Sequence, residues 1–174
     1  MAAMVALLLA VVLLLAANPV PTPVGPGPRY VPPPRPPAAR FACRPAPLEA
    51  GGRVHVELFA RRRVVIVPRG IGLRRPRLRL GRVVGAGCRG RLWTLDPSGV
   101  VRFERPATLG ALFRVWGEPL GPDRLVSFRG RVSVFVNGAR RRGDPRDLRL
   151  ANGDEIVLEV GGHVRPHRSF LFPP

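Results

Sequence analysis

The sequence contains no lysine: its 29 basic residues are all arginine, against 11 acidic residues, and the formal net charge is +18. Alanine, glycine, proline and valine are abundant, so we interpret the preference for arginine mainly as a GC-rich coding bias. A charge of this size still attracts anionic surfaces, because binding releases their counterions. No recognised nucleic-acid motif accompanies the charge, so we expect no specific nucleic-acid partner.

Several motifs of catalysis and cofactor binding are also missing. The chain has no Cys-x-x-Cys, no phosphate-binding glycine loop and no Ser-His-Asp set. His163 and His167 are four residues apart, but Pro166 argues against the helix that a metal-binding pair at this spacing needs. We therefore expect no cofactor and favour a function other than catalysis.

The first 17 residues contain no charged or polar side chain, and Asn18-Pro19 would end a helix there. The apolar core fits a signal peptide, although no basic residue precedes it. Its length barely reaches the roughly 20 residues of a membrane anchor. We expect export, with a cleaved signal peptide or an uncleaved anchor helix as alternatives. A lipid anchor is not expected, since no cysteine lies near this segment.

About half of residues 18–40 are proline. Such a segment favours extended polyproline II and predicts a disordered, semi-rigid linker that holds a domain away from a membrane or wall. The remaining residues, 41–174, are enough for one hydrophobic core. The predicted location is extracytoplasmic, either membrane-anchored or secreted.

The domain is predicted to be mainly β (α+β), small and antiparallel, with one short helix. Thr108 can cap that helix, Leu109, Leu112, Phe113 and Trp116 form its apolar stripe, and Gly117 ends it. Residues 77–83 alternate leucine with arginine, which indicates one strand with a solvated arginine face. Further strands are expected at 54–59, 64–67, 91–95, 100–104, 132–136 and 155–160.

Turn residues join several of these strands. Asp96-Pro97-Ser98-Gly99 predicts a hairpin, and Asn137-Gly138 predicts a tight turn after residues 132–136. The stretch from Asn152 to Ile156, with the Val-Asn-Gly strand before it, is similar to the closing half of β-grasp domains. This is a likeness of fold and implies no function.

Cys43 and Cys88 are the only cysteines. Two cysteines in an exported chain predict one disulfide, since the compartment is oxidising, and two buried thiols are the alternative. The enclosed loop of about 45 residues would stabilise the fold by up to roughly 4 kcal/mol.

Motifs along the domain suggest a relationship. These motifs are Cys43, Pro68-Arg69-Gly70-Ile71-Gly72, Cys88, Leu92, Thr94, Asp96, Ser98-Gly99, Glu104, Phe113-Arg114-Val115-Trp116-Gly117, Val136-Asn137-Gly138 and Gly143-Asp144-Pro145-Arg146. In these residues the chain resembles a family of membrane-tethered prokaryotic proteins, found in actinobacteria, with a histidine-rich domain. That family carries the hairpin pattern Cys-x-x-x-Leu-His-Thr-His-Asp-x-Ser-Gly-x-x-His-x-Glu.

The chain departs from the family pattern at four histidine positions, where Arg53, Trp93, Leu95 and Arg102 stand instead; His55 is kept. The family's histidine cluster looks like a zinc or copper site. The resemblance therefore implies that this chain has lost that site, and we expect no bound metal.

His55, Asp96 and Glu104 remain as a candidate acid–base or hard-ligand site, with Glu57 as a further member. The alternative is that these groups form turn hydrogen bonds and salt bridges with the many arginines.

The sequence thus favours an exported or membrane-anchored, non-catalytic binding or envelope domain. One alternative is an arginine-rich binder of anionic polymers, namely a wall polymer, lipid headgroups or nucleic acid. Another is a residual metal-dependent enzyme that uses His55, Asp96 and Glu104.

Overall fold

The structure is a computed structural model that describes residues 29–37, 40–49, 51–104 and 106–172. The predicted apolar segment 1–17 and the first part of the predicted linker lie outside these residues. Among the residues described, no helix has both the length and the apolar character needed to cross a membrane.

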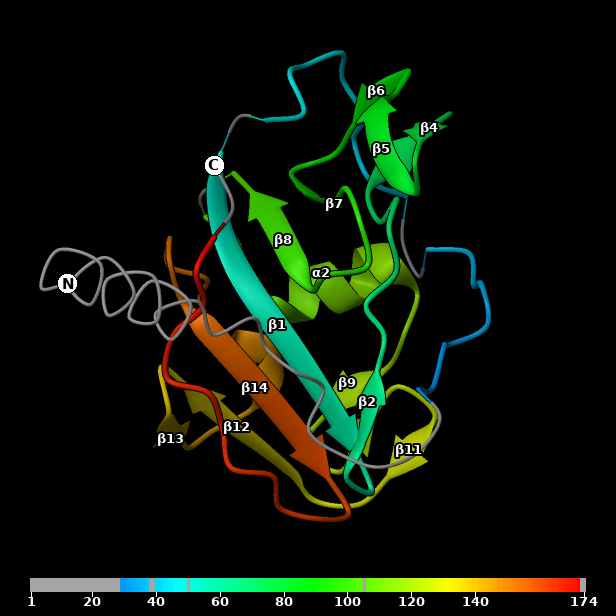
Figure 1. Cartoon of the computed structure of the whole chain (residues 1–174). Coiled ribbons are helices and arrows are strands. Elements are labelled where there is room, and N and C mark those ends of the chain that lie inside the picture. Colours follow the sequence, from blue (N-terminus) through cyan, green and yellow to red (C-terminus); the bar gives the residue numbers. More distant parts are fainter. Residues whose placement is uncertain (1–28, 38–39, 50, 105, 173–174) are drawn as a thin grey trace, which may run out of the picture.

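The main sheet confirms a mainly β domain with one short helix. Its strands follow the order β13-β12-β14-β1-β8-β7, and β2 also pairs with β1. Their bounds are β1 Gly52–Ala60, β2 Arg63–Val65, β7 Leu92–Thr94, β8 Val100–Phe103, β12 Val132–Val136, β13 Ala139–Arg141 and β14 Glu155–Val160. Neighbouring strands are antiparallel except β1 and β14, which run parallel through the middle of the sheet (Figure 1).

The order β2-β1-β14-β12-β13, with a helix between two hairpins and parallel first and last strands, resembles a complete β-grasp sheet. β8 pairs with the first half of β1 and β2 with its second half, so both lie on one edge of β1. Small sheets complete the fold. They are β3 (Leu73–Arg74) with β6 (Cys88–Arg89), β4 (Arg77–Arg79) with β5 (Arg82–Gly85), and β9 (Leu120–Gly121), β10 (Arg124–Leu125) and β11 (Phe128–Arg129). A 3₁₀ helix, η1 (Pro145–Asp147), precedes β14.

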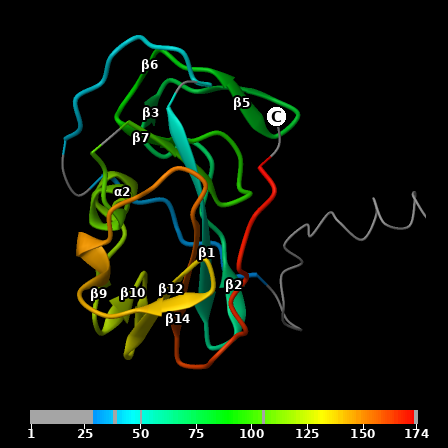
Figure 2. The same ribbon diagram turned by 90° about the vertical axis from the view of Figure 1, so that its left-hand side faces the viewer.

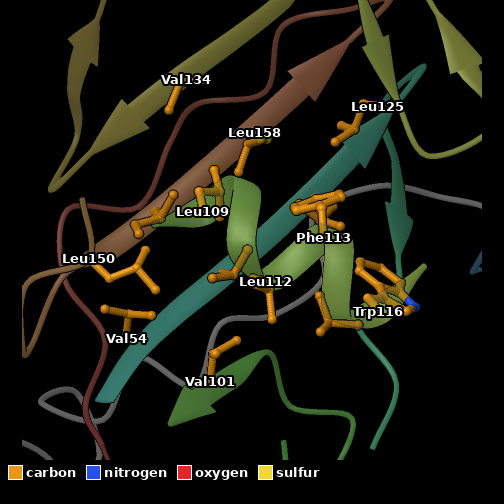
Figure 3. Close-up of a cluster of buried hydrophobic side chains, with 14 of the residues drawn as sticks. Val54, Val101, Leu109, Leu112, Phe113, Trp116, Leu125, Val134, Leu150 and Leu158 are labelled. Carbon is orange, nitrogen blue, oxygen red and sulfur yellow. The ribbon is translucent and has the colours of Figure 1, made fainter. Parts of the chain in front are cut away.

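The helix α2 (Leu109–Trp116) begins and ends as predicted. The Thr108 hydroxyl accepts a hydrogen bond from the Ala111 N–H, and Gly117 adopts the left-handed conformation at the C-terminus. The apolar stripe of α2 is buried against β1, β8 and β14 in the largest hydrophobic cluster (Figure 3). This cluster fixes the helix on one face of the sheet.

The two central strands bury both of their faces. Alternation along β1 directs Val54, Val56 and Leu58 toward α2, whereas His55 and Glu57 lie on the opposite face. We call this opposite face the back face. Figure 2 shows α2 and the C-terminal segment on opposite sides of the sheet. Residues 163–172 cover the back face, and the Phe170 ring stacks on His55 with centroids 3.8 Å apart.

The prediction of a single strand over residues 77–83 is wrong. Leu80 and Gly81 both have positive φ and form the turn of a hairpin between β4 and β5. Leu80 is 98% exposed and Leu78 52% exposed, so the leucines do not face a core. Gly81 is a residue typical of turns, but a leucine beside it in the left-handed region is uncommon, so the sequence did not indicate a turn at Leu80-Gly81.

The predicted linker also needs correction, because its described part contacts the domain. The Tyr30 N–H donates to the Val64 carbonyl at 2.9 Å, and its hydroxyl bonds with the Ser127 hydroxyl at 2.9 Å. Arg35 lies 3.3 Å from the buried carboxylate of Glu118. Over this stretch the proline-rich segment packs along the domain and does not form a free stalk.

The disulfide is present between Cys43 and Cys88, with Cα atoms 5.5 Å apart. Beside it, Arg44 and Arg89 exchange backbone hydrogen bonds of 3.0 and 2.9 Å. The bridge therefore ties residues 40–49 to β6.

The double variant C43S/C88S should lower the free energy of unfolding by up to about 4 kcal/mol, because it frees a 45-residue loop in the unfolded chain. Urea unfolding at neutral pH measures this loss. Reduction of the wild-type protein should reproduce the variant's midpoint, and equal midpoints for oxidised wild type and variant would contradict a stabilising bridge.

Glu118 gives a prediction for pH dependence. Its carboxylate oxygens have no hydrogen-bond partner among the described residues, and burial raises its pKa against the attraction of Arg35 and Arg124. The folded state therefore binds more protons, and the free energy of unfolding falls as pH rises above the ordinary glutamate value of about 4.3.

E118Q should remove the contribution of Glu118 to this decrease in stability with rising pH. The free energy of unfolding of the variant should therefore depend less on pH than that of the wild type. Urea unfolding at several pH values above about 4.3 tests this. D123N, which removes an exposed carboxylate, is the matched control. Equal slopes for E118Q and wild type would refute the assignment.

Candidate functional site

Asp96 and Glu104, two of the predicted site residues, bond to arginines. Asp96 forms an ion pair with Arg82 and accepts the Ser98 N–H at 3.1 Å, as expected of a turn aspartate. Glu104 accepts hydrogen bonds from Arg44 and from Arg89, the latter at 2.9 Å. These contacts match the structural alternative for both residues.

The environment of Glu104 suits an ionised carboxylate. Burial alone would raise its pKa, but hydrogen bonds from Arg89 and Arg44 outweigh burial and hold the pKa below its ordinary value. The guanidinium of Arg89 is itself almost fully buried and lies over the Trp93 ring, 4.0 Å from its centroid. Glu104 therefore neutralises a buried cation.

His55 belongs to a different group of residues. Its Nδ1 lies 2.7 Å from Oε2 of Glu155, and its Nε2 lies 2.8 Å from the Ser98 carbonyl oxygen. One ligand atom from each of His55, Glu57 and Glu155 lies within 4.8 Å of the others. The Glu57 carboxylate also bonds with Nδ1 of His167 at 2.7 Å. The structure thus brings His55 together with Glu57 and Glu155, and this group does not include Asp96 or Glu104.

Sequence reasoning missed Glu155 and His167 as neighbours of His55. Glu155 is directly opposite His55 in the parallel register of β1 and β14, 100 residues apart in sequence. The only local signal was the His-x-Glu pair on β1, which places His55 and Glu57 on one face of the strand. Burial raises the pKa of Glu155, while its contacts with His55 act in the opposite direction.

Four residues singled out by the resemblance, Arg53, Trp93, Leu95 and Arg102, lie close together. Arg53 of β1 pairs with Arg102 of β8, and Arg102 pairs with Trp93 of β7. Arg102 also forms an ion pair with Glu49 at 2.6 Å. The side chains of Trp93 and Leu95 are buried in a hydrophobic cluster and fill this region. A pocket of about 20 Å³ remains beside Arg53, Arg82 and Arg102.

The hairpin β4–β5 combines exposed apolar side chains with arginines. Between residues 73 and 87 there are five arginines and no acidic residue. Leu78, Leu80 and Val84 are 52%, 98% and 56% exposed, and they are three of the five large hydrophobic residues that are exposed among all the residues that the structure describes. We call residues 74–84 the Arg/Leu hairpin.

The base of the Arg/Leu hairpin is fixed to the domain. Val83 is buried in the cluster that contains Trp93 and Leu95, and its N–H donates to the Leu95 carbonyl at 2.8 Å. Arg82 bonds to Asp96. The hairpin pairs with no strand of the main sheet, so its exposed tip extends from an anchored base (Figure 1).

Comparisons with protein-family models, with curated proteins and with solved structures found no match to this chain.

E104Q should lower the free energy of unfolding by about 1.5–3 kcal/mol, because it removes a charged hydrogen-bond partner from the buried Arg89. Urea unfolding at pH 7 measures the loss. Because the pKa of Glu104 is lowered in the folded state, its ionised carboxylate stabilises the fold at pH values above the ordinary glutamate pKa. This contribution is lost as the pH falls through the folded-state pKa.

The variant should therefore approach wild-type stability in acid. D144N, which breaks the exposed pair of Asp144 with Arg146, should have the smaller effect at pH 7. An E104Q protein as stable as wild type at pH 7 would show that the pair has no structural role.

Proposed function

We propose that this protein is an exported, non-catalytic domain of the cell envelope that docks on the anionic surface of a lipid bilayer through its Arg/Leu hairpin. The observation that carries the proposal is the exposure of Leu78, Leu80 and Val84 among five arginines on one projecting hairpin. Exposed apolar residues gathered within a charged rim are typical of interaction surfaces.

The other contacts support a binding function over catalysis. Asp96 and Glu104, two of the groups that could act as acid or base, are engaged by arginines. The disulfide between Cys43 and Cys88 supports an oxidising, extracytoplasmic compartment. These features agree with an envelope protein, either membrane-anchored or secreted.

The leucines favour a bilayer over a soluble polyanion. Arginines near an anionic membrane contribute about 1 kcal/mol each, and they would attract a wall polymer or nucleic acid in a similar way. Only a bilayer also offers an apolar interior, where burial of a leucine side chain adds about 1.5–3 kcal/mol. A binder of soluble anionic polymers, the second candidate, would use the arginines and leave Leu80 in water.

A fluorescent label at the hairpin tip tests the proposal. The full chain with L80C, coupled to an environment-sensitive dye, is reconstituted into vesicles of phosphatidylcholine with or without phosphatidylglycerol. We expect a blue-shifted, brighter emission with the anionic lipid, reversed by high salt as the charges are screened. The additional substitutions R77S/R79S should weaken the free energy of membrane binding by about 2 kcal/mol, since each arginine contributes about 1 kcal/mol.

The same dye at R141C, an exposed position on β13, is the matched control and should not respond. Soluble polyphosphate should leave the dye at position 80 in water. Equal emission at both positions, or equal emission with and without phosphatidylglycerol, would refute docking through the hairpin.

A further inference from the structure

All three histidines of the chain bond through Nδ1 to a glutamate on the back face of the central strands. His55 pairs with Glu155, His167 with Glu57 and His163 with Glu159, at 2.7, 2.7 and 2.9 Å. The first histidine lies on β1 and the other two lie in the C-terminal segment. The pairs therefore bring strand and tail together around a group of carboxylates.

Glu155 is the most deeply buried member of this group. Its side chain is fully buried, and its Oε1 has no hydrogen-bond partner among the described residues. Such an atom carries a desolvation cost that a native fold normally offsets with a partner. Glu57 lies close by, so two carboxylates lie together in a poorly hydrated place.

His55 has the geometry of a metal ligand. Its Nε2 lies 2.8 Å from the Ser98 carbonyl, and because a carbonyl oxygen can only accept, Nε2 carries the hydrogen. Nδ1 faces the Glu155 carboxylate, 2.7 Å away. A metal-bound histidine commonly donates its other ring N–H to a backbone carbonyl in this way, which fixes its tautomer and orientation.

We propose that His55, Glu57 and Glu155 bind one divalent transition-metal ion on the back face of the sheet. Their ligand atoms lie within 4.8 Å of one another, and small side-chain rotations would bring them to the roughly 3–4 Å separation of ligands on one ion. One imidazole nitrogen with carboxylate oxygens suits zinc and its neighbours better than calcium or magnesium. The ion would neutralise both carboxylates and give Glu155 the partner that its Oε1 lacks.

The C-terminal segment would act as the cover of this site. His167 bonds to Glu57 and orients its carboxylate, while the Phe170 ring lies flat on His55. Between Val164 and Phe172 the segment has no regular secondary structure, so metal entry requires only that it lift locally. A bound ion would in turn hold the tail on the sheet.

Zinc binding by the full chain, with its disulfide intact and in mild detergent, tests the proposal. After removal of metal with a chelator, Zn²⁺ is titrated at pH 7 against a chromophoric competitor. We expect one Zn²⁺ per wild-type chain and a rise in thermal midpoint with Zn²⁺ concentration. E57Q and E155Q should lower the affinity at least tenfold, because each removes a ligand.

E159Q is the matched control: it removes a glutamate that also pairs with a histidine on the back face but lies outside the trio. It should bind Zn²⁺ as the wild type does. Circular dichroism of the metal-free variants checks their folding. If E155Q fails to fold, E57Q alone tests the site, since the wild-type Glu57 carboxylate is nearer the surface than that of Glu155.

Replacement of Zn²⁺ by Co²⁺ supplies a second readout, because the visible absorption of Co²⁺ reports its ligands. The spectrum should change in E57Q and stay the same in E159Q. No Zn²⁺ binding by the wild type, or equal binding by E57Q and E159Q, would overturn the site and leave His55 and Glu155 as a buried ion pair.

Discussion

The parallel pairing of β1 with β14 is the constraint on which the rest of the structure depends. It joins two strands about 100 residues apart and aligns His55 with Glu155 and Leu58 with Leu158. Because side chains alternate, the same pairing builds an aliphatic face for α2 and, for the C-terminal segment, a face on which histidine and glutamate lie beside a smaller hydrophobic cluster. The hydrophobic cluster stabilises the sheet, and the back face then holds ionisable groups away from water.

The insertion between β2 and β7 follows from this arrangement. β8 and β2 both pair with the same edge of β1, so β3 to β6 have no place in the main sheet. They are held by the disulfide, by the burial of Val83 beside Trp93, and by ion pairs of Arg82 and Arg89. A region attached at its base in this way leaves the Arg/Leu hairpin exposed at its tip.

Local chemistry made part of the fold predictable from sequence. The Thr108 cap, the Gly117 terminus and the Asn137-Gly138 turn each depend on a few neighbouring residues, and the structure has all three. The Leu80-Gly81 turn was missed because leucine seldom adopts positive φ. Of the group around His55, the sequence indicated only His55 and Glu57. Glu155 joins them through a pairing between distant strands that no local pattern encodes.

The arginines show where composition stops being informative. A coding bias would explain why arginine replaces lysine, and it would account equally for Arg89, buried against Trp93, and for Arg79, exposed on the hairpin. It does not account for a leucine that is 98% exposed at a turn where glycine or asparagine would be less strained. Docking of the proposed kind on a membrane would therefore depend on Leu80 and its apolar neighbours, and the arginines around them would determine the sign of charge that this surface attracts.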